Sequence, residues 1–165
     1  MEFHATPIPG AFLIESSPHP DDRGFFMRIF SADEFAEHGL TAAVVQSSLS
    51  SNRRRGTVRG MHYQAPPSAE TKLIRCIRGA VHSVLVDARP DSPTFRNVMT
   101  LVVGADNPTA VLVPKGVVHA YQNIGSGDGI VINCPNRLYM GEQRREPIDE
   151  IRHEDDPETI FRMDD

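Results

Sequence analysis

Short apolar runs rich in Val, Ile, Leu and Phe recur along the chain and are separated by polar turns. Runs of this length at near-regular spacing predict the strands of a sandwich or a closed barrel. Gly, Pro and Asp are frequent in the turns, as at residues 20–24, 90–93 and 125–129. The predicted strands span residues 11–16, 25–30, 42–48, 57–64, 72–77, 80–88, 98–103, 110–114, 117–124 and 129–134.

One segment carries the signals of a helix. Ser31 and Glu34 have the spacing of a capping box, and Gly39 stands where a helix would end. The sequence therefore predicts one short helix near residues 31–38. The chain from Asp149 onward shows no clear period, so we expect a loosely structured C-terminal segment. Neither a repeat nor a linker divides the chain, which predicts a single domain over residues 1–165.

Composition narrows the class of protein. The 165 residues suffice to bury a core without disulfides, and two cysteines are too few for a disulfide framework. A net charge of −5 argues against a nucleic-acid binder. No apolar run approaches the ~20 residues needed to span a bilayer, and the first residues lack the layout of a signal peptide. We expect a cytoplasmic protein that binds neither nucleic acid nor membrane.

The segment from Pro114 to Asn123 resembles the second sequence motif of the cupin superfamily, with Gly116 and His119 at the motif's spacing. Pro114 and Gly116 would turn the chain at a barrel rim, and the next strand would carry His119 inward. The first cupin motif needs two His one residue apart and a Glu, whereas this chain has only His62 there. Two His fall short of the three or four ligands that hold a metal, so we expect no metal. The predicted fold class is all-β, a cupin-type jelly-roll barrel with one short helix.

Several motifs, in the same order and at the same spacing, resemble the dTDP-4-dehydrorhamnose 3,5-epimerase family over about residues 7–139. They are DRGFF at 22–26, RGMHYQ at 59–64, PP at 66–67, KL at 72–73, VDxR at 86–89, SPTF at 92–95 and PxGxxH at 114–119. The resemblance implies an isomerase, acting without a cofactor on carbons beside the C4 ketone of a nucleotide-linked 4-keto-6-deoxyhexose.

Such a reaction needs a base for the α-proton, a donor for the enolate oxygen and an acid for the opposite face. By resemblance His62 is the base, and its imidazole can accept a proton near neutral pH. Lys72 matches the family residue near the ketone oxygen. His119 matches a second pocket histidine that helps to hold the sugar.

The resemblance also implies contacts to the nucleotide. Arg23 and Arg59 match residues that contact the nucleotide and its diphosphate, which suits a guanidinium. Strict alternation puts Arg59 on the opposite strand face from His62, unless a bulge at Gly60 re-aims one side chain. Phe26, Gln46 and Tyr121 complete the expected substrate contacts, and residues 53–55 are expected to form a solvated basic loop.

The chain departs from the family at the acid. Ile132 stands where the family has the tyrosine that acts as the acid, and an isoleucine cannot deliver a proton. Tyr139 lies near a second family tyrosine, and Tyr121 shares a strand face with His119. We expect Tyr139 to be the catalytic acid, with Tyr121 as the alternative.

Three other departures leave questions open. Ser83 and Arg28 replace family acids, which leaves the nucleobase preference open. The acidic partner that relatives give the base histidine is also unmatched, and Asp87 or an acid in the tail are its alternatives.

The sequence thus predicts an epimerase acting at C3, C5 or both of a nucleotide-linked 4-keto-6-deoxy sugar. By resemblance it is a homodimer whose N-terminal strands are exchanged between protomers. A 3,4-keto-isomerase using His62 on the same substrates is one alternative. A non-catalytic sugar-nucleotide binding protein is another, favoured by Ile132 and opposed by the His62 and Lys72 pair. A metal-dependent cupin enzyme is the last.

Overall fold

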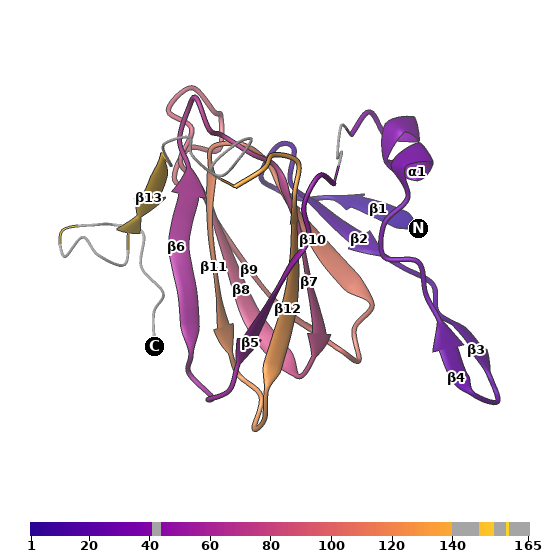
Figure 1. Ribbon diagram of the computed structural model, residues 1–165. Helices are drawn as coiled ribbons and strands as arrows, with labels where there is room; N and C mark the ends of the chain where they lie inside the picture. Colours follow the sequence, from indigo (N-terminus) through magenta and orange to yellow (C-terminus); the bar gives the residue numbers. More distant parts are fainter. Residues whose placement is uncertain (41–43, 140–148, 154–157, 159–165) are drawn as a thin grey trace.

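The computed structural model describes residues 1–40, 44–139, 149–153 and 158 (Figure 1). These residues form strands with one short helix between them. In chain order the elements are β1 (Glu2–Ala5), β2 (Phe12–Glu15), β3 (His19–Asp21), β4 (Gly24–Phe26), α1 (Ala32–Glu37), β5 (Ser48–Asn52), β6 (Val58–Gln64), β7 (Lys72–Arg78), β8 (Ala80–Asp87), β9 (Val98–Gly104), β10 (Thr109–Val113), β11 (Val117–Asn123), β12 (Gly129–Pro135) and β13 (Glu150–Arg152).

Two antiparallel sheets face each other and form a barrel (Figure 1). One sheet has the order β1-β2-β10-β7-β12-β5, and the other has the order β13-β6-β11-β8-β9. The hairpin of β3 and β4 stands apart from both and projects from the barrel (Figure 1). The predicted all-β jelly-roll barrel with one short helix is therefore confirmed for the described residues. No helix among them is long and apolar enough to cross a bilayer.

Alternating inward side chains of both sheets form the main core. The larger core members come from strands of each sheet, so their burial holds the two sheets together. They include Ile74, Val81, Leu85, Val103, Val111, Val117 and Val131. A second cluster lies where α1 packs, with Phe35 against Ile14, Leu73 and Leu112. The helix begins as predicted, because the Ser31 hydroxyl accepts from the Glu34 N–H at 3.5 Å.

The register of the strands departs from the prediction in the first half of the chain. The strand predicted over 42–48 lies instead at β5, with residues 44–47 outside any strand and 41–43 outside the described residues. Pairing with β12 decides this, since Asn52 to Ser48 lie opposite Gly129 to Asn133. The strand predicted over 25–30 shortens to β4, which pairs with β3 across the predicted turn.

Two strands at the ends of the chain were not predicted. β1 pairs with β2, placing Phe3 opposite Ile14. β13 lies in the segment expected to be loosely structured and pairs with β6, with Arg152 opposite His62. β13 forms because the polar edge of β6 supplies its hydrogen-bonding partner, which the sequence of 150–152 does not indicate. The expectation for this part of the C-terminal segment was therefore wrong.

Candidate active site

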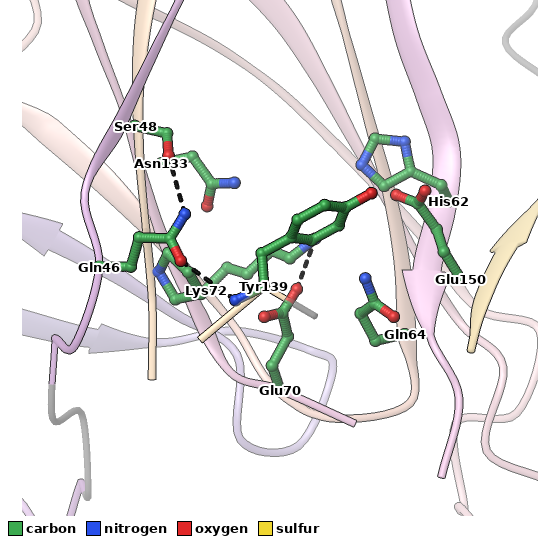
Figure 2. A pocket seen from close by; sticks show the side chains of 10 residues that line it. Gln46, Ser48, His62, Gln64, Glu70, Lys72, Asn133, Tyr139 and Glu150 are labelled. Atoms are coloured by element: carbon green, nitrogen blue, oxygen red, sulfur yellow. Dashed lines mark hydrogen bonds and ion pairs between the residues drawn. The ribbon is translucent and has the colours of Figure 1, made fainter. Parts of the chain in front are cut away.

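A pocket of about 210 Å³ opens at one end of the barrel, where β6 and β12 end and β7 begins (Figure 2). Its walls come from both sheets and from the loops beside them. The lining residues are Gln46, Ser48, His62, Gln64, Glu70, Lys72, Asn133, Pro135, Tyr139 and Glu150. Four residues predicted for the site, His62, Lys72, Tyr139 and Gln46, are brought together here.

A bulge in β6 sets the direction of His62. His119 lies opposite His62 and Tyr121 opposite Arg59, so two residues of β6 face one residue of β11. Gly60 adopts a φ of 96°, and a Cβ there would collide with the carbonyl oxygen of His119. The predicted bulge at Gly60 is confirmed. The Arg59 Nε donates to the Asn52 side-chain oxygen at 2.9 Å, and neither residue lines the pocket.

His62 is a neutral imidazole in this setting. Burial, followed by the positive charge of Lys72, lowers the pKa of His62 to about 4. His119 packs behind it with ring centroids 4.7 Å apart, and burial lowers the pKa of His119 as well. His119 does not line the pocket among the described residues, so it contacts His62 from within the core.

Lys72 is the first residue of β7 and lies opposite Pro135 of β12. Its Nζ lies 3.0 Å from the Glu70 Oε1, and both side chains are only 8% exposed. The ion pair holds the ammonium at a fixed place in the pocket, as Figure 2 shows. Glu70 was not predicted as a site residue. Its position two residues before Lys72 could have indicated an ion pair between the two side chains.

The two candidate tyrosines lie in different surroundings. Tyr139 is 41% exposed and lines the pocket, and its backbone N–H donates to the Gln46 Oε1 at 3.1 Å. Figure 2 shows its hydroxyl pointing toward His62 and Glu150. Tyr121 is buried in the barrel core, where its hydroxyl lies 2.6 Å from the Ser50 Oγ. The geometry therefore favours Tyr139 as the phenol that a bound molecule can reach.

Asn133 and Pro135, rather than Ile132, are the β12 residues in the pocket lining. Ile132 lies opposite Leu49 and Arg75, on the other strand face from the core residue Val131 and from Asn133. Ile132, which was expected to replace the family's tyrosine, does not line this pocket. The amide of Asn133 has no acidic proton, and neither has Ile132, so neither of these β12 residues can act as the catalytic acid.

Arg23 and Phe26 lie far from these side chains in the fold, on the projecting β3–β4 hairpin (Figure 1). The Arg23 side chain is 85% exposed, and its Nη2 donates to the Asp21 carboxylate at 2.6 Å. Phe26 is 67% exposed. Within one chain the structure does not bring either residue to the His62 pocket.

The structure narrows the choice of an acidic residue that could act as the partner of His62. Asp87 is fully buried, away from the pocket lining, and accepts hydrogen bonds from Arg89, Ser92 and Thr94. Burial alone would raise the pKa of Asp87, but those hydrogen bonds outweigh it and hold the pKa well below its usual range. Glu150 of β13 instead lines the pocket, and its carboxylate lies 2.6 Å from the Arg152 Nη2. Glu150 was missed as a named residue because β13 was not predicted.

In the part of the chain that the structure describes, three side chains are spaced like metal ligands, and they lie outside the pocket. Glu2, His4 and Glu15 sit on the exposed face of β1 and β2. His62 and His119 belong to no such group.

The family model and the relatives that match this chain carry the same family description. The family model described as dTDP-4-dehydrorhamnose 3,5-epimerase matches residues 5–156. A Shigella flexneri protein of that name is 38% identical over 146 residues, covering 88% of this chain and 80% of the relative.

Solved structures agree in fold. A Bacillus anthracis enzyme of that name, with TDP and PPi bound, gives a TM-score of 0.80 at 36% identity, covering 84% of this chain and 78% of that chain. A 3'-monoepimerase from Streptomyces bikiniensis in complex with dTDP-quinovose gives a TM-score of 0.74 at 30% identity, covering 80% of this chain and 66% of that chain.

Proposed function

The chain belongs to the dTDP-4-dehydrorhamnose 3,5-epimerase family, and we propose that it epimerises a dTDP-linked 4-keto-6-deoxyhexose at C3, C5 or both. The observation that carries this proposal is that His62 and Lys72 line one pocket with a phenol, Tyr139. A base, a cation and a proton donor are the three groups that inversion beside a ketone requires.

His62 takes the proton from the carbon beside the ketone. It is available as a base because its depressed pKa keeps the imidazole neutral at pH 7. The Lys72 ammonium is the second cause, after burial, of the lowered His62 pKa. During the reaction this ammonium faces the negative charge that forms on the ketone oxygen of the enolate. The enolate then offsets the repulsion between Lys72 and the new imidazolium, so the two charges stabilise the same transition state.

Lys72 is positioned for this role by Glu70. The 3.0 Å ion pair fixes the ammonium before substrate arrives, so little reorganisation is needed when the enolate forms. Tyr139 returns a proton to the opposite face, because phenols keep their proton at neutral pH. The exposure of Tyr139 at the pocket edge supports a role in contact with substrate.

Proton exchange with solvent tests the reaction. The protein is incubated in deuterated water with a dTDP-linked 4-keto-6-deoxyhexose, and deuterium at C3 and C5 is followed by NMR. We expect deuterium at one or both carbons and an inverted product. Tight binding without any exchange would instead support a non-catalytic binding protein.

Inversion at a single carbon is the second candidate. Asn133 faces the pocket and cannot donate a proton as an acid, which leaves Tyr139 as the described phenol in the lining. With one acid, return of a proton at C3 and at C5 need not be equally efficient. Separate rates for the two carbons in the exchange experiment distinguish single from double epimerisation.

We further propose a homodimer in which the β3–β4 hairpin of one protomer carries Arg23 and Phe26 to the pocket of its partner. The hairpin projects from the barrel (Figure 1) and exposes the apolar side chains of Phe25 and Phe26. Exposed apolar side chains that lie together are typical of a protein–protein contact. Arg59, which is close enough to His62 for its charge to lower the pKa of that ring, would meet the diphosphate from the same chain. Both cysteines are free thiols, which fits our proposal of a cytoplasmic setting.

Mixing two inactive variants tests the exchanged hairpin. Arg23→Ala and His62→Asn each damage every site of their own dimers. In a mixed dimer, one site combines an intact His62 with the partner's intact Arg23. Equal mixing with exchange of subunits should restore about a quarter of the sites. No recovery, with mixed dimers verified by mass spectrometry, would show that Arg23 does not complete the partner's pocket.

A further inference from the structure

Two side chains that line the pocket each hold a buried amide oxygen without a hydrogen-bond donor in the described part of the chain. These oxygens are the Gln64 Oε1 on β6 and the Asn133 Oδ1 on β12. Figure 2 shows the two amides on opposite sides of the pocket, with Lys72 and Tyr139 between them. A buried acceptor without a donor is costly, so folded proteins rarely keep one without a reason.

The charged groups of the pocket are already partnered. Glu70 pairs with Lys72 at 3.0 Å, and Glu150 pairs with Arg152 at 2.6 Å. Besides the His62 Nδ1, the buried side-chain atoms of the described lining that have no partner are these two amide oxygens. An amide oxygen can only accept, so its partner must bring a hydrogen. A ketone or a phosphate group has no hydrogen to give, so neither can satisfy these oxygens. A hydroxyl can.

The substrate class offers a matching number of donors. A 4-keto-6-deoxyhexose linked through its anomeric carbon keeps two hydroxyls, one on C2 and one on C3. We propose that the Gln64 and Asn133 side-chain oxygens accept hydrogen bonds from these two hydroxyls and so select a sugar that keeps both. This inference rests on the proposed function, and it assigns the hydroxyl-binding part of the same site.

The pair also explains how the pocket orients the ring. Lys72 lies between the two amides in the pocket (Figure 2), and it is the residue proposed to hold the ketone oxygen. Acceptors on both sides of that cation fix the hydroxyl-bearing edge while the ketone meets the ammonium. A sugar lacking one hydroxyl leaves one amide oxygen buried and unpaired, which is the basis of strong discrimination in enzyme pockets.

Analogues lacking one hydroxyl test the proposal. The probes are the dTDP-linked 4-keto-6-deoxyhexose and its 2-deoxy and 3-deoxy counterparts. Selectivity is measured as the ratio of kcat/KM for deuterium exchange at C5, and again as the ratio of Kd by calorimetry. The wild-type protein should disfavour each analogue by about 10- to 100-fold. The near-isosteric variants Asn133→Leu and Gln64→Met should each lose most of the discrimination against one analogue.

Two further variants separate hydrogen bonding from general damage. Asn133→Asp keeps an acceptor oxygen and should keep the discrimination that Asn133→Leu loses. Asn136→Leu removes an amide whose oxygen already accepts from the Thr71 N–H at 2.8 Å, and it should leave both ratios unchanged. Wild-type indifference to both analogues would overturn the inference, as would unchanged ratios in both apolar variants. Binding without exchange on any of the three sugars would refute the proposed epimerase and leave the Kd ratios to decide this inference.

Discussion

The imidazole rings of His62 and His119 meet edge to face, with centroids 4.7 Å apart and planes at 77° to each other. They project from the neighbouring strands β6 and β11, on which they lie directly opposite. Burial, and then the charge of Lys72, depresses the pKa of both rings. The proposed base is therefore a neutral imidazole that packs against a second neutral imidazole.

Replacing the base should slow the reaction without unfolding the protein. We expect His62→Asn to lower turnover by about 10²- to 10⁴-fold, the usual contribution of a positioned general base. Substrate affinity should change little, because the nucleotide and diphosphate supply most of it. Steady-state kinetics and calorimetric binding measure the two effects. Near-normal turnover in a folded variant would show that His62 is not the base.

Tyr139→Phe should separate proton exchange from inversion. Enolate formation needs only His62 and Lys72, so deuterium should still enter the substrate. The inverted product should be mostly lost, because the proton for the opposite face comes from the phenol. Tyr121→Phe is the matched control, since it removes a phenol bonded to Ser50 in the core and should leave inversion intact. The reverse pattern in the NMR product analysis would exchange the two roles.

The depressed pKa of His62 should move the acid limb of the pH profile. A neutral imidazole is the active form, and it persists until the pH falls to about 4. The kcat/KM should therefore stay nearly flat from pH 8 to 5, whereas an ordinary histidine would lose activity from about pH 6.5 downward. Circular dichroism at each pH confirms that the protein remains folded. An acid limb near pH 6.5 would contradict the arrangement around His62.

Asp87 should matter for stability rather than for catalysis. Its buried carboxylate accepts from Arg89, Ser92 and Thr94, so Asp87→Ala leaves donor groups of three residues without their acceptor. We expect the free energy of unfolding to fall by about 2–4 kcal/mol at pH 7. Its native pKa is lowered, so its contribution is complete above the unfolded pKa of about 3.9 and is lost at lower pH. Denaturant titration at pH 7 and pH 3 measures both effects.

Activity should survive prolonged chelation. His62 and His119 supply two imidazoles near the pocket, fewer ligands than a bound metal requires, and the described metal-like group at Glu2, His4 and Glu15 lies elsewhere. We expect the same turnover before and after dialysis against EDTA. Loss of activity that one added divalent ion restores would overturn a mechanism based on His62 and Lys72 alone.

The sequence alone predicted the features that depend on neighbouring residues in the chain, such as the helix start and most of the core strands. Ser31 and Glu34 predicted the start of α1, and apolar runs predicted most strands that build the core. Gly60 indicated a place for a bulge, because a glycine inside a strand often marks one, and the structure shows that a Cβ there would collide with the His119 carbonyl oxygen. The family motifs pointed to His62 and Lys72 as neighbours, and both line one pocket.

Tertiary structure decided what depends on pairing between distant segments. A strand's side chains alternate between faces, and the pairing of β12 with β7 and β5 turns Asn133 toward the pocket and Ile132 away from it. Glu150 reaches the pocket only because β13 pairs with β6, and the polar residues of β5 form a strand only because β12 lies beside them. The energy of these pairings resides in contacts between segments far apart in the chain, so no local pattern records it.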